Sequence, residues 1–87
     1  MNKDVEELKA AVERNMKGKV LNIVLDFGDK YIIGVDEKNK KNGEEVMDPY
    51  YAVDKKSWKL SGFSPMMEID KFKKTIDKPL YLRKRDG

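Results

Sequence analysis

The side chains of this chain that could do chemistry are carboxylates and amines, because the sequence contains no histidine and no cysteine. Without these two residue types there is no imidazole base, no thiolate nucleophile, no disulfide and no imidazole or thiolate metal ligand. The 16 acidic side chains are scattered, and no two stand out as the paired carboxylates that glycoside hydrolysis requires. We therefore expect no catalytic residue, no enzyme activity and no cofactor.

Two short acidic motifs resemble metal sites but lack the context that such sites need. Asp26-Phe27-Gly28 matches the metal-binding tripeptide of protein kinases, which works only beside a lysine-bearing strand and a catalytic loop in a far larger fold. The polar loop of residues 37–48 has Lys38 and Lys40 where an EF-hand loop needs oxygen ligands. The sequence therefore predicts a turn, a solvated loop and no metal site.

The residues that could bind a partner lie in a hairpin rich in lysine and aromatic side chains and in a basic C-terminal tail. Lysines can contact phosphates while aromatic rings stack on bases, as in proteins that bind single-stranded nucleic acid. In the alternative interpretation the tryptophan covers the edge of the core, the lysines solvate the turn and the tail is frayed. The candidate partner-binding residues are Tyr50, Lys55, Lys56, Trp58, Lys59, Arg83, Lys84 and Arg85.

The charge is distributed unevenly along the chain. Charged residues make up 40% of the 87 residues, and the formal net charge is +3. Basic side chains are in excess in residues 55–87 and acidic ones in residues 1–54, a pattern typical of either an anionic partner or, in a small domain whose halves share one surface, no separation of charge in space. The first residues show no apolar run, and no stretch approaches the ~20 apolar residues of a membrane span. We therefore expect a cytoplasmic protein that does not enter a membrane.

An N-terminal helix is the first element that could position these side chains. We predict one domain, residues 1–87, because a chain of this length supports a single small core. Apolar residues at helical spacing predict a helix over residues 4–17. Asp4 is expected to cap its N-terminus, and Gly18 to end it in a left-handed conformation.

Two hairpins are predicted after this helix. Residues 19–36 read as two strands around a glycine-containing turn, with Leu21, Ile23 and Leu25 pointing together toward the core. Residues 49–63 read as two further strands joined by a lysine-rich turn. The two hairpins together predict a four-stranded antiparallel sheet.

A second helix follows, over residues 65–77, because Ser64 and Pro65 form a typical helix start. Met66 and Met67 at its beginning would either finish the core or form an adaptable partner surface. Residues 78–87 form the basic tail, whose first residues could add a short strand. The expected fold class is α+β, with both helices packed mainly on one face of the sheet. The other face would then be open to a protein partner or to a second copy in a homodimer.

The order of these elements, together with three short motifs, resembles a PepSY-type domain. The motifs are Gly18-Lys19-Val20, Asp29-Lys30-Tyr31 and Tyr51–Ser57. The family places a glycine directly after the last motif, where this chain has Trp58. Residues 48–65 are also similar to small uncharacterised proteins of Gram-positive bacteria and their phages. The resemblance implies an antiparallel sheet with a packed helix, no catalytic residues, and a role in regulating or inhibiting proteases.

These observations lead to two hypotheses of function. The first is a non-catalytic protein-binding or regulatory module, encoded by a phage or another mobile element. It follows from the absent catalytic side chains together with an open sheet face and an aromatic hairpin. The alternative is a nucleic-acid-binding protein that uses the hairpin and the basic tail. The sequence does not decide between them.

Overall fold

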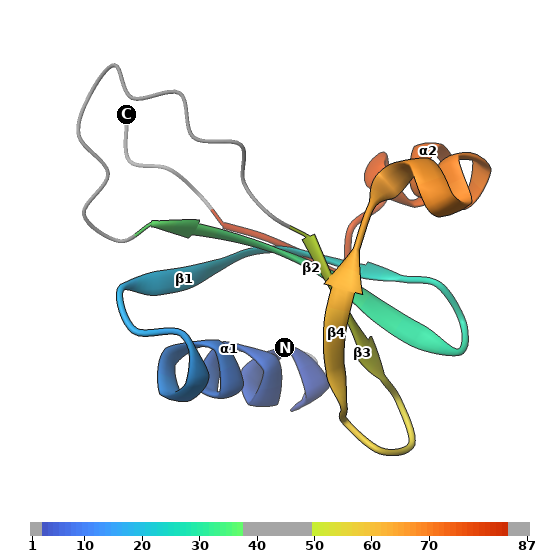
Figure 1. The fold of residues 1–87 in the computed structure, drawn as a ribbon. Coiled ribbons are helices and arrows are strands. Elements are labelled where there is room, and N and C mark those ends of the chain that lie inside the picture. The colour runs from blue at the N-terminus through green and yellow to red at the C-terminus, as the bar shows by residue number, and fades with distance from the viewer. Residues whose placement is uncertain (1–2, 38–49, 84–87) are drawn as a thin grey trace.

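The computed structural model describes residues 3–37 and 50–83 and shows an antiparallel sheet with a helix on each face (Figure 1). Most of the expected polar loop, together with Lys84 and Arg85, lies outside the described residues. No helix in the described ranges is both long and apolar enough to cross a membrane. The elements in chain order are α1 (Lys3–Asn15), β1 (Lys19–Asp26), β2 (Lys30–Glu37), β3 (Tyr50–Asp54), β4 (Leu60–Phe63), the 3-10 helix η1 (Pro65–Glu68), α2 (Ile69–Ile76) and β5 (Tyr81–Leu82).

The ends of the helices differ from the expected bounds. Gly18 has a φ of 79°, the left-handed conformation expected after α1, although the helix itself ends a few residues earlier. The second helix starts as η1, and regular α-helix begins only at Ile69. Ser64 occupies the N-cap position before Pro65 with the expected extended backbone, but its side chain makes no capping hydrogen bond.

The sheet has five strands, which corrects the prediction of four. Its order is β4-β3-β2-β1-β5, and every neighbouring pair is antiparallel. The additional strand β5 places Tyr81 opposite Val24 and Leu82 opposite Ile23. Two residues are too few to show an alternating pattern, so the sequence could not establish this strand. The α+β class and the antiparallel sheet are confirmed.

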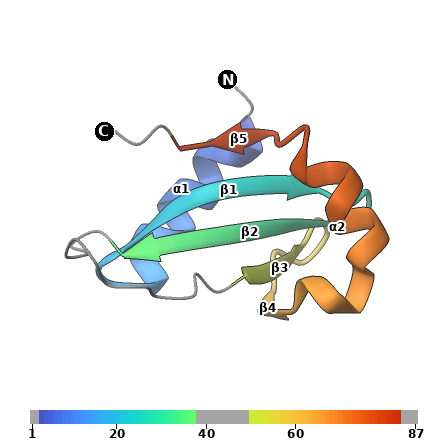
Figure 2. The same cartoon turned by 90° about the horizontal axis from the view of Figure 1, so that it is seen from above.

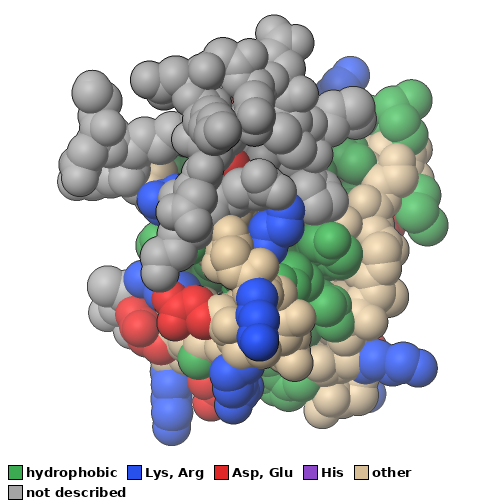
Figure 3. Space-filling model, turned by 60° about the vertical axis from the view of Figure 1, so that its left-hand side comes forward, with side chains coloured by type: hydrophobic (Ala, Val, Ile, Leu, Met, Phe, Trp, Pro, Cys, Tyr) green, Lys and Arg blue, Asp and Glu red, His purple; other side chains and the backbone are tan. Residues whose placement is uncertain are grey.

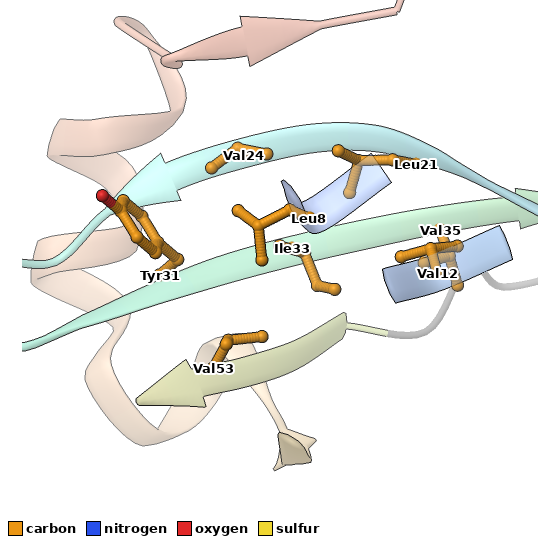
Figure 4. Packing of buried hydrophobic residues seen from close by; sticks show 8 residues of the cluster. All are labelled: Leu8, Val12, Leu21, Val24, Tyr31, Ile33, Val35 and Val53. Atoms are coloured by element: carbon orange, nitrogen blue, oxygen red, sulfur yellow. The ribbon is translucent and has the colours of Figure 1, made fainter. Parts of the chain in front are cut away.

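The two helices lie on opposite faces of the sheet, which corrects the prediction that both cover one face (Figures 1 and 2). On the α2 face, Phe72 and Ile76 of α2 pack against Ile23, Leu25, Phe27, Ile32 and Ala52. The central strands are therefore covered on both sides, so the described part of the chain does not show the open sheet face that was expected for a partner. The α1 face is filled by a cluster shown in Figure 4, made of Leu8, Val12, Leu21, Val24, Tyr31, Ile33, Val35 and Val53.

A β-bulge in β1 lets this strand serve both clusters. The pairing register with β2 shifts between Leu21 and Ile23, which leaves Asn22 as the extra residue. As a result Leu21 and Val24 face α1, whereas Ile23 and Leu25 face α2. The prediction that the three apolar residues of β1 share one face is therefore wrong for Leu21.

A glycine in β2 makes room for the aromatic contact that holds α2. A Cβ atom at Gly34 would lie 2.8 Å from Ile23 Cγ2 and 3.1 Å from Tyr50 Cε1, which is too close for unstrained packing. The ring of Tyr50 meets the ring of Phe72 in α2 edge to face, with centroids 5.4 Å apart. Because α2 has no fully buried residue, this ring contact is a main part of its attachment.

Candidate binding groove at the β4 edge

The turn between β3 and β4 is organised by Asp54 and holds Trp58 in a left-handed conformation. The Asp54 carboxylate accepts hydrogen bonds from the backbone N–H groups of Ser57, at 3.0 Å, and Lys56, at 2.8 Å. These bonds hold the pKa of the Asp54 carboxyl below its usual value. The Trp58 N–H donates to the Asp54 carbonyl at 2.8 Å. The resulting φ of Trp58 is 59°, which is costly for any residue with a Cβ atom.

The side chains of Trp58 and Leu60 stand at the rim of an apolar groove between α1 and the β3–β4 hairpin. Trp58 is 36% exposed and Leu60 is 41% exposed. The indole lies 6.3 Å from the ring of Tyr31, measured between centroids. The groove has a volume of about 60 Å³, and its lining residues are Leu8, Ala11, Val12, Asn15, Met16, Ile33, Val53, Trp58 and Leu60.

A second, wider hollow borders the indole and the exposed surface of α1. It has a volume of about 430 Å³, and Trp58 lines both the apolar groove and this more polar hollow. Ala10 and Ala11 provide the low part of the helix surface here. The lining residues of this hollow are Glu7, Ala10, Ala11, Arg14, Asn15 and Trp58.

Tyr31 supports the groove from inside the α1 face. Its hydroxyl donates a hydrogen bond to the Asp4 carboxylate, and this bond, with desolvation and the charge of Asp4, raises the pKa of Tyr31 to about 12. Since α1 begins at Lys3, Asp4 lies inside the first turn and is not the N-cap that the sequence suggests. Its carboxylate instead ties α1 to β2.

The ammonium group of Lys55 makes its contacts within the molecule. Its Nζ donates to Asp26 Oδ1 at 2.7 Å and lies 4.7 Å from the centroid of the Tyr31 ring. The bond from Lys55, followed by one from the backbone N–H of Gly28, lowers the pKa of Asp26. Of the lysines in the turn, Lys55 is thus a structural residue that holds the hairpin against the β1–β2 turn.

The structure brings together only part of the predicted binding cluster. Lys56 and Lys59 are exposed in the same turn as Trp58. Tyr50 lies on the other face of the sheet, where it packs against Phe72 of α2. A partner that contacts the indole on the α1 face therefore cannot stack on the Tyr50 ring at the same time.

Arg83, the predicted tail residue that the structure describes, is also remote from this hairpin. Arg83 follows β5, whereas the hairpin ends in β4, and these two strands form the opposite edges of the sheet. Figure 3 shows one face of the molecule, on which acidic and basic side chains lie beside each other with hydrophobic side chains between them. The described residues thus do not join the predicted basic residues into one stripe.

Several residues that line this groove were not predicted from the sequence to belong to a binding site. Leu60 is expected in the core by its alternation with the neighbouring residues, yet it lies at the groove rim because β4 is an edge strand. The small residues Ala10 and Ala11 were a usable signal, since side chains of this size leave a hollow beside the helix that carries them. Their contact with the hairpin could not be known before α1 was placed.

The groove has the chemistry of a binding surface. Its lining contains no ionisable side chain, and its polar residue Asn15 donates its side-chain N–H to the Ala11 carbonyl at 2.9 Å. Within residues 3–37 and 50–83, no group of three or more acidic side chains could hold a metal ion. The arrangement can accept apolar side chains but offers no general acid, base or nucleophile.

Comparison with known proteins identifies no relative of this chain. No protein family, no curated protein and no solved structure matches the chain. The resemblance to PepSY-type domains stays a prediction, and the function has to be argued from the geometry of the groove.

Proposed function

We propose that this chain is a non-catalytic protein-binding or regulatory module that takes apolar side chains of a partner protein into the groove beside Trp58. The observation that carries the proposal is the conformation of this residue. A glycine would adopt its left-handed backbone at no cost, yet the position holds a large indole that is only partly buried. Tryptophan is the residue type most enriched among those that dominate binding energy in protein interfaces.

The surroundings of the indole support the same proposal. The groove beside it is apolar, and the second hollow that it lines carries the charges of Glu7 and Arg14. An apolar centre with a charged rim is the usual organisation of a protein–protein interface. The resemblance to PepSY-type domains, which are associated with regulating proteases, favours a regulatory role.

The proposal is tested by selecting peptides on the wild-type protein and counter-selecting them on Trp58→Gly. The glycine keeps the turn, because it accepts a φ of 59°, and removes only the indole. We expect apolar-rich peptides that bind the wild type at least about tenfold more tightly than the variant, a difference of ~1.4 kcal/mol. Binding should also shift the fluorescence of Trp58, the only tryptophan.

A matched control is available at the opposite edge of the sheet. Leu82→Ala removes an apolar side chain that is 59% exposed in β5, far from the groove. The selected peptides should bind this variant as tightly as the wild type. Peptides that bind Trp58→Gly and wild type equally, or a selection without enrichment, would show that the groove is not the binding site.

Nucleic-acid binding is the second candidate, and it is favoured by the exposed Lys56 and Lys59 beside Trp58. It requires an oligonucleotide that quenches the tryptophan fluorescence and whose affinity falls steeply between 50 and 200 mM salt, by the ~10-fold or more that several phosphate contacts imply. Lys56→Gln together with Lys59→Gln should then reduce the salt dependence. Absence of binding to a single-stranded oligonucleotide at 50 mM salt would dismiss this candidate.

A further inference from the structure

The strand β4 presents backbone groups that no described residue uses. It is the last strand of the sheet, with β3 as its single neighbour. The N–H of Asp54 donates to the carbonyl of Lys59 at 3.2 Å, so this pair is a hydrogen-bonded pair of the antiparallel ladder. Because such pairs alternate along a ladder, the N–H and C=O groups of Leu60 and Gly62 point away from β3. We call this row the β4 edge.

Exposed apolar side chains lie at both ends of the β4 edge. Six large hydrophobic side chains are exposed among the described residues, and four of them, Trp58, Leu60, Met66 and Met67, lie immediately around β4. Met66 and Met67 are the most exposed of all, at 77% and 72%. A soluble chain seldom leaves both unpaired strand groups and large apolar side chains at one place without a partner.

The exposure of the two methionines is fixed by the structure of η1. The Met67 N–H donates to the Ser64 carbonyl at 2.9 Å. Glu68, the next residue, accepts a charged hydrogen bond from Lys30 at 2.6 Å, which raises the pKa of Lys30 and lowers that of Glu68. These contacts anchor η1 to β2, so the methionines are held outward.

We infer that the β4 edge pairs with the β4 edge of a second copy of this chain, antiparallel and about a two-fold axis that passes beside Ser61. In this register Leu60 lies opposite the partner's Gly62, and Gly62 opposite the partner's Leu60. Both residues direct their backbone groups outward, so the two pairs form four hydrogen bonds. A Cβ atom at Gly62 would meet nothing within 4 Å, so this position leaves open space beside the leucine side chain.

Charge and apolar surface both fit this register. Lys59 lies opposite the partner's Phe63, and an ammonium group beside an aromatic ring is favourable, whereas two lysines opposite each other would repel. Trp58 at one end of β4 comes next to the partner's η1, because an antiparallel pair joins opposite ends. The exposed side chain of Leu60 is thereby brought against the partner's Gly62. An axis beside Gly62 would instead set two glycines opposite each other.

This inference does not rest on the proposed function, since the hydrogen bonds that it requires come from the backbone of the β4 edge, although Leu60 borders both the edge and the groove. The experiment is the mass of the protein in solution by light scattering and by sedimentation, from about 10 μM to about 1 mM, the weak end of specific affinities. We expect a concentration-dependent dimer of twice the 10.1 kDa chain mass. A protein that remains a monomer at about 1 mM would overturn the inference.

Two variants locate the contact. Gly62→Pro removes an outward donor and leaves the bonds from β4 to β3, as proline does in edge strands. We expect the dissociation constant to rise at least tenfold, whereas Gly62→Ala, which keeps the donor, remains a dimer. Circular dichroism checks the fold. If Gly62→Pro unfolds, Leu60→Lys decides, because it places a charged side chain next to the axis, opposite the partner's Gly62. A dimer that persists in a folded Gly62→Pro variant, or in Leu60→Lys, would overturn the inference.

Discussion

Trp58 combines a backbone conformation suited to glycine with the largest side chain among the natural residues. The left-handed region costs a residue with a Cβ atom about 1–2 kcal/mol. That cost is offset in part by the contact of the indole with Tyr31 and with the residues of the groove. Two substitutions can therefore separate the effect of the backbone conformation on stability from that of the side chain. Glycine relieves the backbone strain, and alanine does not.

We expect Trp58→Ala to be less stable than Trp58→Gly by about 1 kcal/mol. Both variants lose the same indole contacts, and only the alanine keeps a Cβ atom at a φ of 59°. The measurement is urea denaturation followed by circular dichroism, because the tryptophan signal is lost in both variants. Equal stability of the two variants would mean that the turn relaxes out of the left-handed conformation.

Tyr31 gives a prediction for alkaline pH. Its folded-state pKa of about 12 lies above the ordinary value of 10.0, so folding favours the neutral phenol. The stabilisation is complete below pH 10 and is lost as the pH rises from 10 to 12, up to about 2.7 kcal/mol for two pH units. We expect the free energy of unfolding to fall over this range, and to fall less in Tyr31→Phe.

Lys30 also titrates at alkaline pH, because its hydrogen bond to Glu68 raises its pKa, and the stabilisation from this pair is likewise lost as the pH rises. The comparison with Tyr31→Phe is therefore essential, because this variant keeps the contribution of Lys30. Ultraviolet absorbance of the phenolate, measured on both proteins, assigns the late titration to Tyr31. If the two proteins lose stability equally between pH 10 and 12, the hydrogen bond to Asp4 does not stabilise the fold.

At the scale of elements, β2 shows how sequence and packing are related. Its residues 31–36 are all buried, because one helix covers each face of the sheet. A nearly continuous apolar run is typical of a strand buried on both sides, and the run Tyr31–Val35 was a signal for this arrangement. Gly34 within it is required by the approach of Ile23 and the Tyr50 ring.

We expect Gly34→Ala to lower the free energy of unfolding by about 1–3 kcal/mol, the usual range for overpacking. The added methyl group would lie 2.8 Å from Ile23 Cγ2 and 3.1 Å from Tyr50 Cε1, so both side chains and the α2 contact must shift. Gly62→Ala is the control, because its Cβ meets nothing within 4 Å. It should change stability by less than about 0.5 kcal/mol in the same urea titration.

The elements that the sequence predicted correctly are those with a clear period, and the errors have physical causes. Helical spacing predicted α1, and alternation with turn residues predicted both hairpins. The amphipathic pattern of α2 shows which side of the helix is buried but not which face of the sheet covers it. Similarly, nothing about Asn22 as a residue type announces a bulge, so the faces of β1 could not be assigned.

The candidate site could also be predicted only in part, because it depends on how elements that are far apart in sequence pack together. Trp58 was found because it is unique in the chain and stands where a related pattern has glycine. The groove beside it depends on the distance between α1 and β4, which are far apart in sequence. Tyr50 and Lys55 were drawn into the prediction by their neighbourhood in sequence, but their side chains make other contacts in the fold.

At the scale of the whole molecule, the sheet carries one hydrophobic cluster on each face. The two clusters differ in how deeply the covering helix is buried. The α1 cluster includes fully or nearly fully buried residues of the helix itself, among them Leu8 and Val12. The helix α2 contributes only partly buried side chains, Phe72 and Ile76, to the other cluster. The α2 side should therefore open at a lower free energy than the α1 side.

We expect the backbone amides of α2 to exchange with deuterium by local opening, at rates at least about tenfold above those of the slowest amides in β1 and β2. The amides of α1 should belong to the slower group, because this helix is held by buried residues on its inner side. Native-state exchange followed by NMR measures both. Equal protection of α2 and β1 would show that the two sides open as one unit.

The bulge at Asn22 also determines where the length of the chain can change. The buried apolar residues of β1 are assigned to one of the two clusters by their position relative to the bulge, since alternation reverses there. Gaining or losing a single residue in β1 would turn the apolar side chains on one side of the change to the wrong face, whereas the same change in a surface turn would leave the strand faces as they are. Insertions and deletions accumulated during descent should therefore be found in the turns of this fold and be rejected in β1.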